Sequence, residues 1–168
     1  RPCSPLVRLP PVDHIRRTRE QYAALGYPPY SWVTNTDAPA FSKLAKPLSK
    51  CRLGLVSSGG IYQQGQVAFH YKDDISLRVI NTRTDVNSLR ATHFAYDLTD
   101  ARKDPNVVLP LAALNRLQAG GELGELAENA YTFMGGIYSA RKVREQIAPE
   151  LLSRFQRDEV DVVMLVPV

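Results

Sequence analysis

The 168-residue sequence is predicted to form an α/β fold, a three-layer Rossmann-like domain with a mostly parallel sheet. The first observation behind this is that Arg52–Ser57 and Val160–Val168 are apolar at successive positions. Runs of this kind are typical of strands buried on both faces of a parallel sheet. The second observation is that the sequence between these two runs alternates between helical and strand-like patterns. We expect the two strands to run parallel, either adjacent or one strand apart.

The amino-terminal part predicts an arm and a helix. Residues 1–12 contain four prolines and should be extended. Asp13 then caps a helix that Gly26 ends. The following segment, residues 27–32 (Tyr-Pro-Pro-Tyr-Ser-Trp), is an aromatic loop stiffened by proline. Its aromatic side chains are interpreted as a cover over the core, with a pocket wall or a docking surface as the alternative.

The second half of the chain predicts one more strand and several helices. Leu77–Ile80 is a short strand, and residues 84–106 have little regular pattern but many polar groups. Pro110 begins a helix that a glycine pair closes. Helices are expected over residues 139–157, interrupted at Pro149.

Composition limits the classes of function. The chain is predicted to be a single domain over residues 1–168, with 44% hydrophobic and 23% charged residues and a net charge of +4. The basic clusters at 16–19 and 141–144 lack interleaved aromatic residues, so we expect solvated helix faces and no nucleic-acid partner. The alternative is a basic pocket rim for an anionic substrate. No apolar run approaches the roughly 18 residues of a membrane span.

Cysteine and histidine usage favours a thiol-containing, metal-free protein. Cys3 and Cys51 are far apart and have no metal-type spacing, which indicates unpaired thiols in a reducing, cytoplasmic compartment. The three histidines are distant from one another and no cysteine accompanies them at ligand spacing. No metal site and no cofactor bound by this chain are therefore expected.

A serine- and glycine-rich turn follows the first buried strand. It consists of Ser57, Ser58, Gly59 and Gly60. Glycines allow backbone N–H groups to converge on an anion, so the turn is a candidate anion-binding site. It matches neither a Walker A sequence nor Gly-x-Gly-x-x-Gly, and a plain tight turn is the alternative.

A histidine with nearby carboxylates provides the second candidate site. His93 and Asp97 would share one face if residues 93–97 form a helical turn. A carboxylate can fix the tautomer of a histidine and raise its basicity, which suits general acid–base catalysis. The alternative is a loop stabilised by Asp and Asn capping bonds.

Several blocks along the chain resemble the glycine/sarcosine/betaine reductase component B and D-proline reductase selenoprotein family. Their order and spacing agree over most of residues 10–168. The blocks are Lys46–Leu48, Leu55–Gly60, Asp74–Ile80, His93–Asp97, Asp104–Pro110, Tyr131–Gly136 and Val160–Val168.

The resemblance implies an oxidoreductase that cleaves a C–N bond α to a carboxylate. Family enzymes use a selenocysteine or cysteine nucleophile, and thiols supply the electrons. This implies a small amino-acid-like substrate, a thiol or thioredoxin-type reductant, and a homo- or hetero-oligomer in which a partner subunit carries a pyruvoyl group. The family's nucleophile directly follows the last strand. We therefore expect it immediately after Val168, encoded by a codon that ordinarily means stop, and we expect the 168 residues alone to be inactive.

Roles for individual residues follow from that chemistry. Arg78 and the turn of residues 57–60 are candidates to bind the substrate carboxylate. For Arg78 the alternative is a surface strand residue. His93, oriented by Asp97, is the candidate to protonate the leaving amine. Two alternatives to a reductase remain: a non-catalytic binding or assembly subunit on the same fold, and an acid–base enzyme that uses His93 and Asp97.

Overall fold

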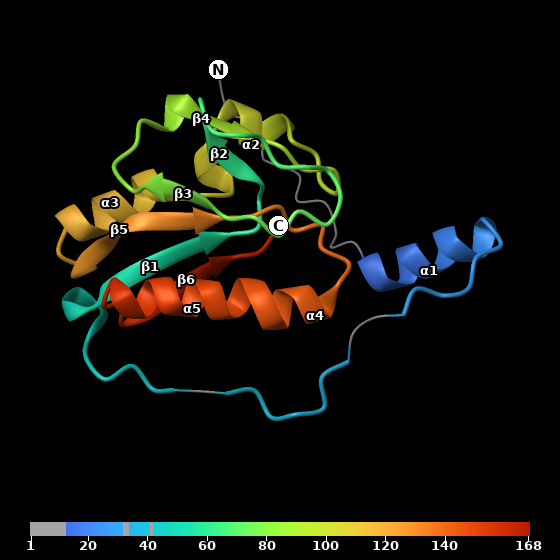
Figure 1. Ribbon diagram of the computed structural model, residues 1–168, viewed down its shortest axis with the longest axis horizontal. Coiled ribbons are helices and arrows are strands. Elements are labelled where there is room, and N and C mark those ends of the chain that lie inside the picture. Colours follow the sequence, from blue (N-terminus) through green and yellow to red (C-terminus); the bar gives the residue numbers. More distant parts are fainter. Residues whose placement is uncertain (1–12, 32–33, 41) are drawn as a thin grey trace, which may run out of the picture. The chain divides into compact units, whose positions relative to one another are not determined.

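A four-stranded sheet with the strand order β3-β5-β1-β6 lies at the centre of the fold (Figure 1). The computed structural model describes residues 13–31, 34–40 and 42–168. Strands β5 (Glu125–Thr132), β1 (Arg52–Ser57) and β6 (Val162–Val166) run parallel to one another. Strand β3 (Arg78–Asn81) pairs with β5 in the antiparallel direction. The predicted α/β class with a mostly parallel sheet is therefore confirmed.

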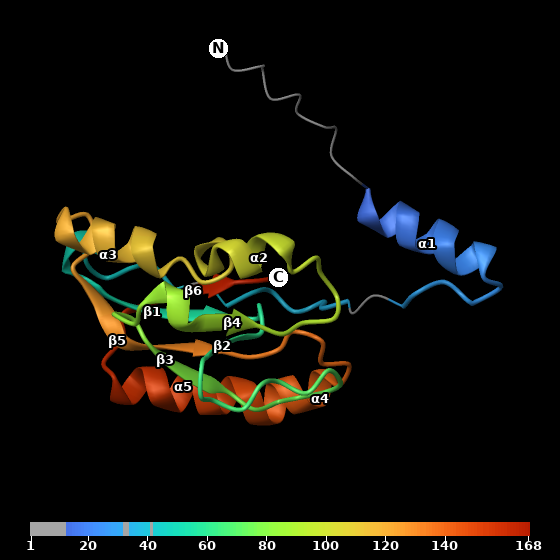
Figure 2. The same ribbon diagram turned by 90° about the horizontal axis from the view of Figure 1, so that it is seen from above.

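Helices lie on both faces of this sheet (Figure 2). One face carries α4 (Ala140–Lys142) and α5 (Ala148–Arg157), and the other carries α2 (Thr99–Lys103) and α3 (Leu111–Ala119). The larger hydrophobic cluster includes residues of β1, β5 and α3, and a smaller cluster includes Phe155 of α5. The specific Rossmann-like, three-layer assignment stays a prediction.

Strands β1 and β6 are adjacent and parallel, as predicted, but β6 is not buried on both faces. It pairs with β1 along one side and is the last strand of the sheet. The side chain of Leu165 is 69% exposed. The prediction of a doubly buried strand is therefore wrong for β6. The prediction failed because a run of apolar residues has the same sequence pattern in a central strand and in an edge strand.

Strand β5 was not predicted, although it lies in the middle of the sheet. Its sequence, Glu-Leu-Ala-Glu-Asn-Ala-Tyr-Thr, contains few β-branched residues and would suit a helix locally. Ala130 and Tyr131 are nevertheless fully buried between neighbouring elements. A separate antiparallel pair, β2 (Ile61–Gln63) with β4 (Leu89–Ala91), was also missed. The remaining short elements are the 3₁₀ turns η1 (Leu48–Lys50), η2 (Val86–Ser88) and η3 (Pro105–Val107).

The helical segment 140–157 is continuous, and the predicted break at Pro149 does not occur. The helix instead widens into π geometry over η4 (Val143–Ile147), which ends two residues before Pro149. Proline cannot donate a backbone hydrogen bond and its ring crowds the preceding turn, and a local widening accommodates both effects. The predicted helix after Pro110 is confirmed as α3.

The chain divides into two units, residues 1–41 and 42–168. In the first, α1 (His14–Ala24) begins where Asp13 accepts a hydrogen bond from the Arg16 amide, as predicted. The ring of Tyr22 makes edge contacts with the rings of Tyr27 and Tyr30. The expected arm of residues 1–12 and the Trp32 side chain lie outside the described residues. That all 168 residues form one domain stays a prediction.

Candidate functional site

The carboxyl ends of β1 and β6 meet at Ser58 and Val168. The Ser58 amide donates to the carbonyl of Val166 at 3.1 Å, and the Val168 amide donates to Ser58 Oγ at 3.0 Å. In α/β sheets, ligands usually bind beyond the carboxyl ends of the parallel strands. This edge of the sheet is therefore the candidate functional site.

The turn of residues 57–60 is built by internal hydrogen bonds. Ser57 Oγ donates to the carbonyl of Val108 at 2.7 Å and accepts from the Gly59 amide at 3.1 Å. The Gly60 amide donates to the carbonyl of Phe133 at 3.0 Å. Because the amides of residues 58–60 all have partners within the protein, they are not free to surround an anion. The geometry matches the tight-turn alternative.

His93 is buried beside this turn. Its Nδ1 accepts a 3.0 Å hydrogen bond from the Ala95 amide, so in the neutral ring the proton lies on Nε2. Nε2 is buried and has no hydrogen-bond partner among the described residues. Burial lowers the pKa of His93, which favours the neutral ring. A β-carbon on Gly135 would lie 3.2 Å from Nε2 and 3.2 Å from Ser58 Cβ, so His93 and Ser58 flank the same glycine.

Asp97 does not orient the His93 ring. Its carboxylate accepts from the amide and the hydroxyl of Thr99 at 2.9 and 2.7 Å, and the Thr99 hydroxyl lowers the pKa of Asp97. The expected His93–Asp97 pair is replaced by the capping alternative. Tyr96 is the neighbour that was missed: its ring lies 4.7 Å from the His93 ring, and its hydroxyl donates to the Gly59 carbonyl at 2.8 Å. Residues 93–96 are not helical in the structure, so no regular spacing in the sequence indicated this contact.

The Arg78 side chain is hydrogen-bonded to a neighbouring loop. Its Nε donates to the carbonyl of Val67 at 2.7 Å, and its Nη1 donates to Ser76 Oγ at 2.8 Å. The guanidinium carbon lies 4.3 Å from the centre of the Phe69 ring. These contacts hold the guanidinium against residues 67–77. Among the described residues, no hydrogen bond joins Arg78 to Ser58 or to His93.

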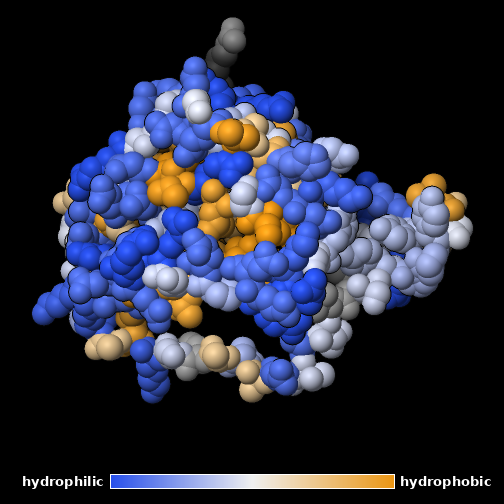
Figure 3. Space-filling model, viewed as in Figure 1, coloured by the Kyte–Doolittle hydropathy of each residue, from blue (hydrophilic) through white to orange (hydrophobic). Residues whose placement is uncertain are grey.

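An apolar cavity of about 330 Å³ lies on the α5 side of the same edge. Ser58 lines it together with Leu151 of α5 and Leu165 of β6. In Figure 3, hydrophobic side chains gather in a hollow above α4 and α5. No local sequence pattern indicates this cavity, because its walls come from segments about 110 residues apart, such as Ser58 and Pro167.

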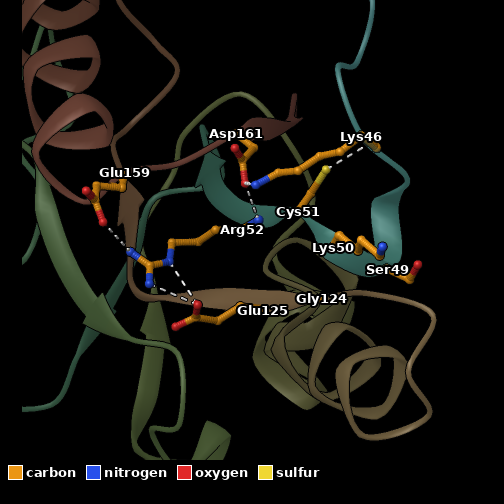
Figure 4. Close-up of a pocket in the computed structure, with 9 residues that line it drawn as sticks. All are labelled: Lys46, Ser49, Lys50, Cys51, Arg52, Gly124, Glu125, Glu159 and Asp161. Atoms are coloured by element: carbon orange, nitrogen blue, oxygen red, sulfur yellow. Dashed lines mark hydrogen bonds and ion pairs between the residues drawn. The ribbon is translucent and has the colours of Figure 1, made fainter.

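A second, charged cavity of about 570 Å³ lies at the amino ends of the strands (Figure 4). Asp161 pairs with Lys46 Nζ at 2.8 Å and accepts from the Arg52 amide at 2.8 Å, and the Lys46 bond lowers the pKa of Asp161. The Arg52 guanidinium reaches Glu125 at 3.0 Å and Glu159 at 3.7 Å. Each of these charged groups thus has a partner of opposite charge. They tie the starts of β1, β5 and β6 together.

Cys51 belongs to this amino-terminal end. Its side chain is buried, and Sγ lies 3.4 Å from the carbonyl oxygen of Pro47. Cys3 lies outside the described residues. Among the described residues, no group of three His, Cys, Asp or Glu side chains is placed to hold a metal ion. No helix in the described part of the chain is long and apolar enough to cross a membrane.

Residues 32–168 match the family model described as glycine/sarcosine/betaine reductase selenoprotein B. The chain belongs to this reductase family. Over 134 residues it is 30% identical to the D-proline reductase subunit gamma of Acetoanaerobium sticklandii, covering 80% of this chain and 55% of that protein. Over 147 residues it is 30% identical to the glycine reductase complex component B subunit gamma of Symbiobacterium thermophilum, covering 80% and 33%.

Another reductase relative is the betaine reductase complex component B subunit beta of Peptoclostridium acidaminophilum. It is 25% identical over 143 residues, covering 79% of this chain and 31% of the relative. The chain thus spans about half to a third of the length of these curated relatives. No solved structure matches it. The family resemblance identified from the sequence is confirmed.

Proposed function

We propose that the chain is part of a subunit of a reductase complex that cleaves a C–N bond α to a carboxylate. The observation that carries this proposal is the family match over residues 32–168. In the reaction, two thiols are oxidised to a disulfide, and the substrate takes up two electrons and two protons as the C–N bond breaks. The proposed substrate is a small amino-acid-like amine, and the reductant is a thiol or thioredoxin-type protein. The relatives' names as complex subunits support a hetero-oligomer.

The nucleophile in this proposal is a selenocysteine or cysteine that follows β6. Ser58 supports such a position, because its hydroxyl holds the backbone amide of Val168 at the end of the strand. The hydroxyl makes no hydrogen bond as a donor among the described residues, so its proton is available to a neighbouring anion. A pyruvoyl group on a partner subunit would bind the substrate amine. This pyruvoyl group would be carried by the partner subunit and not by this chain.

His93 is proposed to donate from Nε2 toward the leaving nitrogen once a local movement of the Gly135 backbone opens this buried atom to the site. Its Nδ1 is already an acceptor, so the neutral ring presents a donor on the side of Gly135 and Ser58. The lowered pKa keeps this ring neutral near pH 7, which suits hydrogen-bond donation. Asp97 has no part in the proposal, because its carboxylate caps Thr99.

The test is to purify the complex through a tag on the full-length protein and to assay it with dithiothreitol and amino-acid substrates. His93→Phe should lower kcat at least tenfold, while the matched His70→Phe should not, because His70 is exposed and bonds to Lys72. The 168-residue chain alone should be inactive, and extension with cysteine after β6 should restore turnover in the complex. A stable complex without thiol-dependent amine release would favour the non-catalytic assembly subunit.

A further inference from the structure

The apolar cavity beside Ser58 has the features of a ligand site. We propose that it binds the hydrocarbon part of the substrate, so that the preferred substrate is an aliphatic amine or amino acid with an uncharged side chain of several carbons. This rests on the proposed function for the reaction, and it adds which part of the substrate the chain recognises. A volume of about 330 Å³ is in the range of small-molecule pockets.

The chemistry of the lining selects an apolar group. Among the described residues that line the cavity, Ser58 is the only polar one and none is charged. A charged side chain of a substrate would lose its hydration here without gaining a partner. A hydrocarbon group, by contrast, should bind about fourfold more tightly for each methylene that it buries. The ammonium and carboxylate of the substrate would stay outside the apolar wall.

The position of the cavity connects it to the reacting edge of the sheet. Ser58 lines the cavity and also accepts the hydrogen bond from the Val168 amide. Ser58 also lies against the backbone of Gly135, and His93 Nε2 lies against the same glycine. A substrate whose hydrocarbon part lies in the cavity would thus have its polar end near the Ser58 hydroxyl. This end is where the proposed nucleophile and donor act.

The helical wall is shaped by the π turn. Val143 and Ile147, which bound η4, both line the cavity, and Ala148 and Leu151 continue the wall into α5. Single π turns are frequent at functional sites, where they displace one wall of a helix. Ala148 and Leu151 are the residues whose size should limit the substrate.

Binding can be located without relying on turnover. The 168-residue chain, with labelled Leu and Val methyl groups, would be titrated with glycine, alanine, valine and proline and followed by NMR. Valine and proline should shift the methyl signals of Leu151 and Leu165, and glycine should not. Leu117 of α3 is an internal reference, because it lies on the other face of the sheet and is absent from the lining.

Leu151→Trp should fill the cavity and weaken valine binding at least tenfold. Leu152→Trp is the matched control: the neighbouring leucine is 58% exposed and does not line the cavity, so binding should persist. Equal loss in both variants, shifts confined to other methyl groups, or signals that change only with protein concentration would overturn the inference. The last outcome would mean that another protein copy covers the cavity. Retained valine binding in an inactive complex would reject the proposed function alone, and turnover without valine or proline binding would reject this subsite alone.

Discussion

The Val168 amide donates a 3.0 Å hydrogen bond to Ser58 Oγ, which ties the end of β6 to the turn after β1. The same serine donates its own amide to Val166. Two hydrogen bonds to one residue therefore align the last residues of β6 with the turn. This alignment gives the candidate site its geometry, because the backbone beyond β6 is held where Ser58 and Gly135 already meet His93.

Ser58→Ala should loosen the end of β6 with little effect on global stability. The lost hydrogen bond is exposed, so the free energy of unfolding should fall by about 0.5–1 kcal/mol. Hydrogen exchange at the Val168 amide should accelerate. Ser57→Ala is the matched comparison: the buried Ser57 hydroxyl has two partners, so its loss should cost about 1–3 kcal/mol. Urea denaturation and hydrogen exchange would measure both, and equal costs would contradict this account.

Gly60→Ala should destabilise the protein more than Gly65→Ala. Both glycines have positive φ angles, +66° and +97°, so both substitutions strain the backbone by about 1–2 kcal/mol. At Gly60 the new methyl group would also collide with the carbonyl of Thr92, whereas Gly65 faces open space. The difference between the melting temperatures of the two variants would measure the destabilisation that the collision causes. Similar melting temperatures would show that the turn can move away from Thr92.

The sequence predicted those elements whose pattern is local. Strand β1 was found with its observed bounds, because Leu53, Leu55 and Val56 are apolar between clear breaks. Helix α3 followed from its leucine spacing and its closing glycines. Strand β5 was missed because burial of Ala130 and Tyr131 comes from neighbouring elements, not from the strand's own propensity.

For the candidate site, the sequence indicated which residues matter better than how they interact. Ser58 and His93 were selected from their sequence context, and the structure brings both to Gly135. The His93–Asp97 pairing failed because an aspartate two residues before Thr99 can cap that residue instead. The hydrogen bonds of Arg78 to the 67–77 loop depend on non-local packing. No spacing in the sequence indicates such contacts.

His93 should make folding stability depend on pH near neutrality. Burial lowers its pKa in the folded state below the ordinary histidine value of about 6.5, so the unfolded chain takes up this proton first as the pH falls. The stabilisation is complete above the unfolded pKa and decreases as the pH falls below about 6.5. His93→Phe should flatten the stability curve between pH 7 and 5, measured by urea denaturation. An unchanged slope would mean that the ring is not desolvated.

Asp161→Ala should lower the melting temperature more than Glu159→Ala. Asp161 bonds both Lys46 and the Arg52 amide at 2.8 Å, and its removal leaves two donors without that partner. Glu159 is largely exposed and lies 3.7 Å from Arg52, so its pair should contribute little. Because the pKa of Asp161 is lowered, its stabilisation is present above the unfolded pKa and is lost as the pH falls through the folded one. Differential scanning fluorimetry at pH 7 and pH 3 would measure this, and the difference between the two variants should be smaller at pH 3 than at pH 7.

Met164→Lys should reduce association of the 168-residue chain. The outer side of β6 has no strand partner among the described residues, and Val163, Met164 and Leu165 are exposed along it. An apolar edge strand presents unpaired backbone groups to other chains, and a lysine on such an edge opposes pairing. Val67→Lys is the matched control, because Val67 is exposed but lies outside the strands. Light scattering over a concentration series should show association for the wild type and for Val67→Lys, and a shift toward monomer for Met164→Lys. A wild-type chain that stays monomeric at every concentration would show that the β6 edge does not drive pairing.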